Sequence, residues 1–255
     1  MFPVLFNIGP LTLHTYGLLV ATGLFTGVYL SALRAGKEGY NRDVVLDLGF
    51  YIVLAAIIGS RLLYVIVEYK TYLDSPLRVF KIWEGGLVFF GGVLGAIPVA
   101  VWFLRKHKIP FWPMADIFAP YVALAHGIGR LGCLAAGCCY GRPTTSWLGV
   151  TFTSDQAIAR PLNTPLLPTQ LFDSVNEITI FLILLVARNH KRFDGQLILL
   201  WLMLYSVGRF IVEIYRGDPR GWIIEGVLST SQGVGIAVFV VSAFVFVKLW
   251  KRKSA

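Results

Sequence analysis

The stretch LTLHTYGLLVATGLFTGVYLSAL, residues 11–33, decides the fold class of this chain. Its 23 residues include no Asp, Glu, Lys or Arg. A helix rises ~1.5 Å per residue and the hydrocarbon core of a bilayer is ~30 Å thick, so a run of this length can cross it. The segment therefore predicts a transmembrane helix.

Six further apolar segments follow along the chain. We predict spans at residues 48–67, 85–104, 116–137, 170–187, 195–215 and 226–247. These runs are too long for strands and lack the two-residue alternation of a membrane barrel, so we expect no strands. The sequence predicts an all-α, polytopic bundle of about seven transmembrane helices that forms a single domain over residues 1–255.

The composition agrees with a membrane protein. The chain is 56% hydrophobic and 15% charged, whereas a soluble domain is about 25% charged, and its mean hydropathy is +0.68. The net charge of +9 lies mainly in short loops. Because no basic face interleaved with aromatic residues occurs outside the spans, we expect no nucleic-acid partner.

Basic residues are unevenly divided between the two sets of loops. One set holds Arg34, Lys37, Arg42, Arg105, Lys106, Lys108, Arg188, Lys191, Arg192, Lys248, Lys251, Arg252 and Lys253. The opposite set holds Lys70, Arg78, Lys81, Arg142, Arg160, Arg209, Arg216 and Arg220. Cytoplasmic loops are enriched in Lys and Arg, so the first set is predicted to be cytoplasmic. We expect the N-terminus and the long loop near residues 138–169 outside, and the C-terminus inside.

Arg130 lies within a predicted span, in the segment HGIGRLGC at residues 126–133. A charge at the centre of a spanning helix costs ~2.5–3.5 kcal/mol on insertion scales, and such residues usually face the bundle interior and serve a function. The flanking glycines thin the helix and allow a ligand or another backbone to approach. The alternative interpretations are a snorkelling arginine and a structural ion pair.

A second polar face is predicted near the end of the sixth span. Tyr205, Arg209, Glu213 and Arg216 recur at helical spacing and are expected on one face of a helix. They form either a self-contained salt-bridge ladder or a set of guanidinium donors for a ligand. Two arginines from different spans suit a phosphate, which a guanidinium binds in a bidentate manner. At that depth the available phosphate belongs to a phospholipid.

Three cysteines, Cys133, Cys138 and Cys139, lie within seven residues. This spacing is unlike a usual zinc pattern or a disulfide framework, so we expect no metal and assign the thiols to packing. Tyr16 taken alone is typical of an interfacial aromatic belt. The glycines of WEGGLVFFGG, residues 83–92, indicate close helix packing.

Together these segments resemble the prolipoprotein diacylglyceryl transferases of bacteria. The resemblance runs from HTYG at residues 14–17 to Ser231 and Gln232, and its most specific parts are GRLG (129–132), PTQLFD (168–173) and YSVGRFIVEIYR (205–216). It implies a multi-pass protein of the bacterial inner membrane. That family moves the diacylglyceryl group of phosphatidylglycerol onto the lipobox cysteine of a preprolipoprotein, forming a thioether and releasing glycerol phosphate, without a cofactor.

The resemblance also implies roles for individual residues. Arg130 and Arg209 would hold the lipid phosphate, while Tyr16, Tyr205 and Glu213 would line the site. The further substrate-binding residues implied are Arg216, Gly86, Gly91 and Gly92. Many members of that family carry histidine, a usual candidate base, where this chain has Phe90, and many read Gly-Asn where it has Gly132 and Cys133.

The departure at Phe90 leaves the catalytic base open. Our hypothesis is that His126, one turn before Arg130 on the same helix face, is the base. In the alternative, the field of the arginines lowers the pKa of the substrate thiol and no base is needed. A transporter with Arg130 and Arg209 in its solute path is a competing class, disfavoured because the sequence lacks internal symmetry and paired broken helices.

Overall fold

The computed structural model describes residues 3–8, 11–73, 75–81, 85–218 and 221–254. Trp83, Glu84 and Arg220, which the sequence analysis used, lie outside these ranges.

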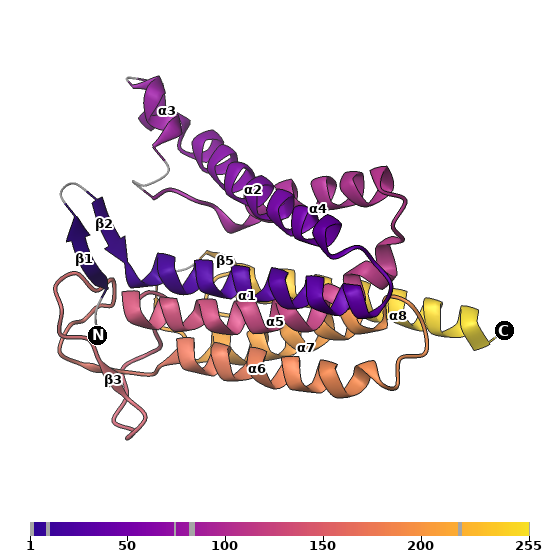
Figure 1. Ribbon diagram of the computed structural model, residues 1–255. Helices are drawn as coiled ribbons and strands as arrows, with labels where there is room; N and C mark the ends of the chain where they lie inside the picture. The colour runs from indigo at the N-terminus through magenta and orange to yellow at the C-terminus, as the bar shows by residue number, and fades with distance from the viewer. Residues whose placement is uncertain (1–2, 9–10, 74, 82–84, 219–220, 255) are drawn as a thin grey trace. The chain divides into compact units, whose positions relative to one another are not determined.

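Seven helices in the described part of the chain are long and apolar enough to cross a membrane, which confirms the predicted polytopic helical bundle (Figure 1). They are α1 (Thr15–Lys37), α2 (Arg42–Val67), α4 (Phe89–Lys106), α5 (Phe111–Ala136), α6 (Thr169–Arg188), α7 (Gln196–Ile214) and α8 (Thr230–Ser254). The short helices α3 (Tyr69–Leu73) and η1 (Pro76–Phe80) lie between α2 and α4. Large apolar side chains such as Phe25, Leu94 and Phe244 are about two-thirds exposed on the spans, as a surface that faces lipid requires.

Short strands form three two-stranded antiparallel sheets between the helices. They pair β1 (Val4–Ile8) with β2 (Leu11–His14), β3 (Val150–Thr151) with β4 (Pro165–Leu166), and β5 (Trp222–Ile224) with β6 (Leu228–Ser229). The expectation of a chain without strands was therefore wrong for the connecting segments. Residues 11–14, predicted as the start of the first span, form β2. Outside a helix the backbone N–H and C=O groups still need partners, and a hairpin supplies them.

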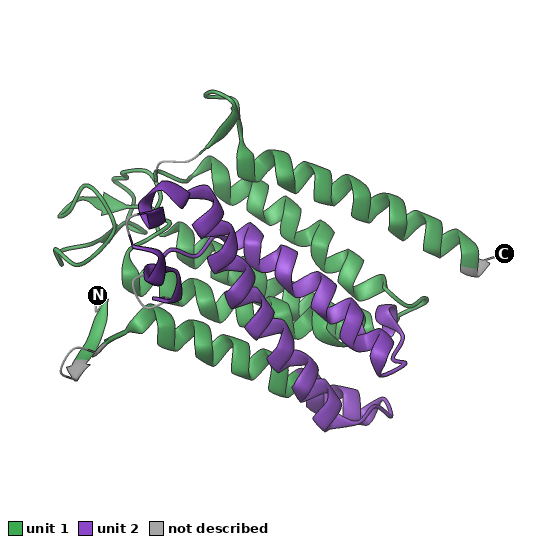
Figure 2. Cartoon of the chain, turned by 90° about the horizontal axis from the view of Figure 1, so that it is seen from above, with its two compact units in different colours: residues 1–30, 115–255 green, residues 31–114 purple. Residues whose placement is uncertain are grey.

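The chain divides into two compact units (Figure 2). Unit 1 comprises Met1–Leu30 and Ala115–Ala255, and unit 2 comprises Ser31–Met114. Helices α1 and α5 each contribute to both units. The single domain expected from the sequence stays a prediction.

In unit 1, small residues allow α5 to pack closely against its neighbours. A Cβ atom at Gly23 or Gly27 of α1 would meet the backbone carbonyls of Ala125 and Tyr121 on α5. On the other side, the Ser174 hydroxyl of α6 donates a hydrogen bond of 2.9 Å to the carbonyl of Gly127. Close approach of this kind is typical of membrane helices, whose association depends on backbone contact rather than on water exclusion.

The unit 1 helices also share a buried apolar cluster. Its fully buried members are Ala119, Ala123, Ile180, Leu184 and Leu197, which come from α5, α6 and α7. On α5 this cluster lies between Asp116 and His126. It therefore packs the three helices against one another between the polar residues of α5.

The start of α7 is bound to α5 by Asp116. Its carboxylate accepts hydrogen bonds from the backbone N–H groups of Gly195, Leu197 and Ile198 at 2.8, 2.8 and 3.1 Å. The first N–H groups of a helix lack intrahelical partners, and the helix dipole favours an anion there. Lys191 lies 3.1 Å from the same carboxylate. Burial lowers the pKa of Lys191, but its hydrogen bond to Asp194 and the charge of Asp116 outweigh this and raise it.

In unit 2, α2 and α4 pack through facing glycines. A Cβ at Gly91 would meet the carbonyl of Gly59, and one at Gly95 would meet the carbonyl of Ala55. This arrangement explains the glycine-rich opening of the third span, which the sequence analysis assigned to close packing.

Arg61, the charged residue inside the second span, has a structural role in unit 2. Its guanidinium donates hydrogen bonds to five backbone carbonyls, those of Arg78, Val79, Lys81, Gly85 and Gly86. It also lies over the rings of Tyr64 and Tyr72. The side chain is 6% exposed. Arg61 thus binds the connection between α2 and α4 to the end of α2.

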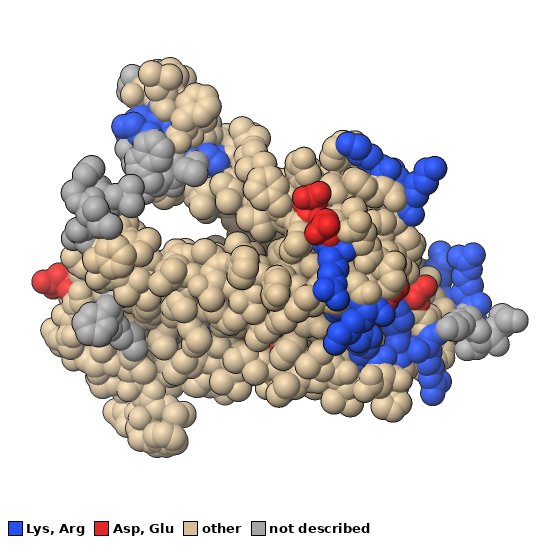
Figure 3. All heavy atoms as spheres, in the orientation of Figure 1, with Lys and Arg blue, Asp and Glu red and all other residues tan. Residues whose placement is uncertain are grey.

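Basic side chains gather around the C-terminal end of α8 (Figure 3). The α6–α7 connection contributes Arg188, Lys191 and Arg192, and α8 contributes Lys248 and Lys251. This distribution is the one used to predict a cytoplasmic C-terminus. The orientation itself stays a prediction.

Candidate active site

Two helices of unit 1 present matching pairs of polar side chains to each other. His126 and Arg130 are four residues apart on α5, and Asp173 and Glu177 are four residues apart on α6, so each pair lies on one helix face. His126 Nδ1 lies 2.9 Å from Glu177 Oε1, and Arg130 Nε lies 3.3 Å from Asp173 Oδ2. The polar faces of α5 and α6 are therefore joined by two successive contacts.

The carboxylates of these pairs are deeply buried. The Glu177 and Asp173 side chains are 1% and 5% exposed, and Arg130 is 14% exposed. An isolated buried charge is costly, so each acid is retained with a partner. The sequence analysis gave neither acid a role. Their spacing could have indicated that they pair with α5. The two acids are four residues apart in an apolar span, as are His126 and Arg130.

Helix α7 covers this face with aromatic rings. The indole of Trp201 donates a 3.3 Å hydrogen bond to Glu177 Oε2 and stacks on Tyr205 with ring centroids 5.8 Å apart. Tyr205 in turn lies 5.5 Å from the ring of His126. The charges of Arg130 and Arg209 both act on Tyr205, so the predicted Tyr205 lies near both arginines.

Arg209 and Glu213 form an ion pair on α7. Arg209 Nη2 lies 2.6 Å from Glu213 Oε2, and the side chains are 9% and 4% exposed. The predicted i,i+4 salt bridge is confirmed. It does not use every donor of the guanidinium, because Arg209 Nη1 is buried without a hydrogen-bond partner among the described residues.

Arg216 is not on α7, contrary to the prediction that it shares a helical face with Tyr205. Helix α7 ends at Ile214, and Arg216 lies in the segment that follows. This segment pairs with the loop after α5, since Gly217 N–H donates to the Tyr140 carbonyl at 3.1 Å and Arg142 N–H donates to the Tyr215 carbonyl at 3.0 Å. Pairing with that loop ends the helix.

The Arg216 side chain nevertheless turns into unit 1 and is 2% exposed. It binds both oxygens of Asp218 at 3.0 Å, and its Nη1 lies 4.0 Å from Asp173 Oδ2. Asp173 is therefore shared between Arg130 and Arg216. Burial raises the pKa of Asp218, an effect that the charge of Arg216 opposes.

Each of the three arginines thus has a carboxylate partner, so their charges are largely balanced. What remains for a ligand is hydrogen-bonding capacity. Arg130 Nε, like Arg209 Nη1, is buried without a hydrogen-bond partner among the described residues. Two guanidinium groups from different helices, each held by a carboxylate and each with a donor to spare, can bind the oxygens of an anion.

Tyr16 reaches the same region from the first turn of α1. Gly132 of α5 makes room for it, because a Cβ at Gly132 would lie 3.1 Å from the Tyr16 carbonyl oxygen. The charge of Arg130 acts on Tyr16, and the three cysteines lie near it. The structure therefore brings together the predicted unit 1 residues: Tyr16, His126, Arg130, Tyr205, Arg209, Glu213 and Arg216.

The predicted glycines Gly86, Gly91 and Gly92 belong to unit 2. Gly86 has φ +76°, and a Cβ there would contact the Tyr64 ring and the Arg61 guanidinium. A Cβ at Gly92 would contact the Ser60 hydroxyl. These glycines serve packing within unit 2, and their role in substrate binding stays a prediction.

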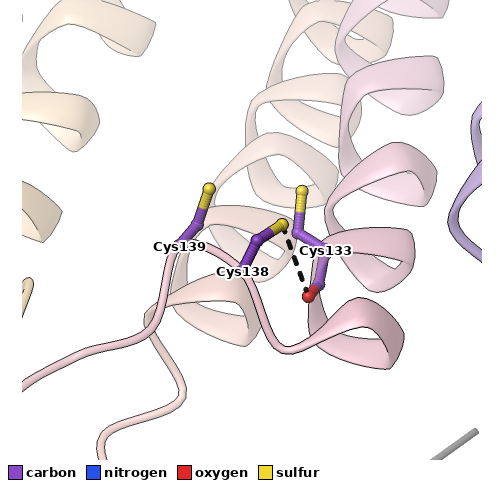
Figure 4. Close-up of side chains that lie close together, drawn as sticks. All are labelled: Cys133, Cys138 and Cys139. Carbon is purple, nitrogen blue, oxygen red and sulfur yellow. Dashed lines mark hydrogen bonds between the residues drawn. The ribbon is translucent and has the colours of Figure 1, made fainter. Parts of the chain in front are cut away.

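The three cysteines converge at the end of α5 (Figure 4). Their sulfur atoms all lie within 4.8 Å of one another. Cys133 lies in the last turn of α5 and the other two lie in the loop that follows. The Cys138 thiol donates a hydrogen bond to the Cys133 carbonyl, and the positive charges of Arg216 and Arg130 act on Cys139. The cluster therefore borders the arginine site.

The fold and the site define a multi-pass helical membrane protein with buried arginine–carboxylate pairs between its helices. The model of the prolipoprotein diacylglyceryl transferase family matches residues 3–248, and the chain belongs to that family. The chain is 37% identical over 238 residues to phosphatidylglycerol–prolipoprotein diacylglyceryl transferase 2 of Clostridium perfringens, covering 93% of this chain and 91% of the relative.

Two further relatives carry the name phosphatidylglycerol–prolipoprotein diacylglyceryl transferase. The protein of Clostridium tetani is 37% identical over 246 residues, which cover 96% of this chain and 97% of the relative. That of Geobacter sulfurreducens is 33% identical over 256 residues, which cover 98% and 96%. The similarity therefore extends over the whole bundle rather than over a single motif.

Proposed function

We propose that this protein transfers the diacylglyceryl group of phosphatidylglycerol to the lipobox cysteine thiol of preprolipoproteins, the first step of lipoprotein maturation, in the bacterial inner membrane. Membership of the family and the names of the relatives support this proposal. The structural observation that carries it is the pair of buried guanidinium donors, on Arg130 and Arg209, that have no acceptor among the described residues.

Arg130 and Arg209 are assigned to the lipid phosphate. During transfer the sulfur of the peptide attacks a glyceryl carbon, the bond from that carbon to the phosphate oxygen breaks, and glycerol phosphate leaves with the electron pair. Negative charge gathers on the phosphate as this happens. Donors already held in position by Asp173 and Glu213 stabilise that charge without reorganising, most strongly in a site from which water is excluded.

Tyr16, Tyr205, Glu213 and Arg216 are assigned to the lining of the site. The two tyrosines combine a ring that tolerates acyl chains with a hydroxyl that binds polar groups. Glu213 holds Arg209, and Arg216 shares Asp173 with Arg130. These residues position the arginines as well as bordering the substrate.

The substrate thiol must lose its proton, because its pKa is ~8.5 and the thiolate is the nucleophile. We assign His126 as the acceptor. An ionised Glu177 carboxylate at Nδ1 favours the tautomer with a proton on that atom, which leaves Nε2 free to accept one. The alternative is that Arg130 and Arg209 lower the thiol pKa enough without a base.

Transfer from phosphatidylglycerol vesicles to a lipobox-cysteine peptide tests the proposal. The measured quantities are the mass gain of the peptide and the release of glycerol phosphate. We expect transfer by the wild type, none by Arg130→Ala, and normal transfer by Arg34→Ala, an exposed arginine paired with Glu38. A folded wild-type protein that transfers nothing would contradict the proposal and favour the transporter class, for which solute flux into the same vesicles is the measurement.

A further inference from the structure

The cysteine cluster has the geometry of a site rather than of packing. All three sulfur atoms lie within 4.8 Å of one another, and none of the three cysteines is in a disulfide. Cys133 is 8% exposed, while Cys138 and Cys139 are partly exposed. Packing alone requires sulfur among apolar groups, not three sulfur atoms gathered beside one another (Figure 4).

The loop is built to hold the thiols in this arrangement. Gly137 ends α5 with φ +73°, and a Cβ there would press on Phe152 and Ala157. Cys139 adopts φ +62°, a left-handed conformation that an L-residue keeps only when its surroundings enforce it. Hydrogen bonds from the start of α6 hold the loop in this conformation.

Two side chains at the start of α6 bind the main chain of the cysteine loop. Thr169 Oγ1 donates to the Cys139 carbonyl and Gln170 Nε2 donates to the Cys138 carbonyl, each at 2.7 Å. Both donors are fully buried. Asp173, the partner of Arg130, lies one turn further along the same helix, so the thiols and the arginine site share one support.

Three converging thiolates are a ligand set for a thiophilic d10 ion. Zinc–sulfur bonds are ~2.3 Å long, so three sulfurs around one tetrahedral zinc lie ~3.8 Å apart. The observed limit of 4.8 Å is reached from there by small side-chain rotations. Three thiolates and Zn²⁺ carry one net negative charge. Arg216 and Arg130, each of which also has a carboxylate partner, act electrostatically on Cys139.

We propose that Cys133, Cys138 and Cys139 bind Zn²⁺ and that the fourth position of this ion receives the thiol of the lipid-accepting cysteine. This inference rests on the proposed transferase function and adds to it the means by which the thiol is held and activated. Three protein ligands with one open position are the composition of catalytic zinc sites. A thiol that coordinates such an ion is deprotonated.

The reaction balances without a further reagent. The peptide thiol binds zinc and gives up its proton to His126 or to water. The zinc-bound sulfur then supplies the electron pair for the new carbon–sulfur bond, and the carbon–oxygen bond to the phosphate breaks. Glycerol phosphate leaves with that bond's electrons beside Arg130, and the thioether, a weaker zinc ligand than the thiolate, dissociates.

The first test is the metal content of tag-free protein purified in detergent. We expect about one zinc per chain in the wild type and in Tyr140→Phe, a control in the same loop that changes no thiol. The triple Cys→Ser variant should lose the metal while keeping its thermal unfolding transition in the presence of phosphatidylglycerol. Equal zinc content in wild type and triple variant would overturn the inference.

The second test reads the fourth position directly. Cadmium-substituted protein absorbs in the ultraviolet through its thiolate ligands, and a lipobox peptide should increase this absorption, whereas the same peptide with serine in place of cysteine should not. Identical spectra with both peptides would overturn the proposal that the peptide thiol binds the fourth coordination position of the metal.

Transfer activity separates this inference from the proposed function. We expect Cys139→Ser to transfer at least ~100-fold more slowly than wild type, the upper range for altered metal sites. Full transfer by a zinc-free triple variant would sink the zinc site and leave the transferase standing. Zinc-loaded wild type that transfers nothing would contradict the transferase function and leave the zinc site standing.

Discussion

Arg130 on α5 and Asp173 on α6 lie with Nε and Oδ2 3.3 Å apart, inside a bundle where neither atom has a hydrogen-bond partner among the described residues. The contact fixes the guanidinium by charge alone and leaves its hydrogen-bonding capacity for a ligand. This relationship governs how Arg130 can be tested.

Arg130→Lys keeps the positive charge beside Asp173 but loses the planar fork that binds two oxygens. We therefore expect near-wild-type stability and transfer reduced at least ~10-fold. Arg130→Ala instead leaves Asp173 buried with a weaker partner, which costs ~3–5 kcal/mol for a typical buried pair. The double variant Arg130→Ala/Asp173→Asn should recover stability but not transfer. Thermal unfolding and initial transfer rates measure the two effects, and a Lys variant with full activity would contradict phosphate binding by Arg130.

His126→Gln tests the base. Removing a general base costs about 10²–10⁴-fold, and the loss should shrink as the pH approaches the ~8.5 pKa of the thiol, since the nucleophile then ionises without help. The measurement is kcat/KM against pH for both proteins. Normal turnover at neutral pH would show that His126 is structural and would leave thiol activation to the cysteine site or the arginines.

Gly132 and Gly17 provide a matched pair of helical glycines. A Cβ at Gly132 would meet the Tyr16 backbone at 3.1 Å, whereas nothing lies within 4 Å of one at Gly17. We expect Gly132→Ala to shift the first turn of α1 and reduce transfer, while Gly17→Ala leaves transfer unchanged and gains up to about 1 kcal/mol in helix propensity. Equal activities would show that the position of Tyr16 does not matter.

Asp116 makes a stability prediction that is independent of catalysis. Asp116→Ala removes the acceptor for three backbone N–H groups at the start of α7 and should cost at least ~2 kcal/mol, the upper end for a helix cap. Asp194→Asn, at a site 59% exposed, is the control and should cost well under 1 kcal/mol. Denaturation in mild detergent measures both.

The ion pair of Lys191 with Asp116 also makes the stability of the protein depend on pH. Its pKa is raised in the folded protein, so protonation stabilises the fold below the ordinary value of ~10.4, and this contribution is lost as the pH rises through the folded pKa. Wild type should therefore lose stability at high alkaline pH relative to Lys191→Met. If the free energy of unfolding of the two proteins differed by the same amount at every pH, the role of this ion pair would be contradicted.

The sequence predicted the helices well because an apolar run of spanning length has few alternative structures. It misplaced Arg216, since helical periodicity cannot register that Tyr215 and Gly217 pair with Arg142 and Tyr140 of a distant loop. It found Arg130 from the cost of a charge in a membrane and Arg209 from helical spacing. It did not find Asp173 as the partner of Arg130, because a partner depends on which helices adjoin.

The arrangement of the three cysteines could not be predicted from the sequence either. Linear spacing gave no zinc pattern, yet a left-handed residue and two buried donors from α6 bring the sulfurs together. Short-range spacing rules describe regular loops. They do not describe a loop whose path is set by another helix.

Arg61 contacts the connection between α2 and α4 through five main-chain oxygens and the ring of Tyr72. Most of these contacts depend on the path of the backbone and not on the identity of the side chains. The exposed side chains of Leu77 and Phe80 take no part in these contacts, so we expect both positions to tolerate substitution. Gly86 should not tolerate it, because of its positive φ and the close approach of Tyr64 and Arg61. A reporter group or a short epitope placed at Leu77 should therefore leave unit 2 intact. The backbone contacts of Arg61 therefore make this connection a suitable attachment point on the protein.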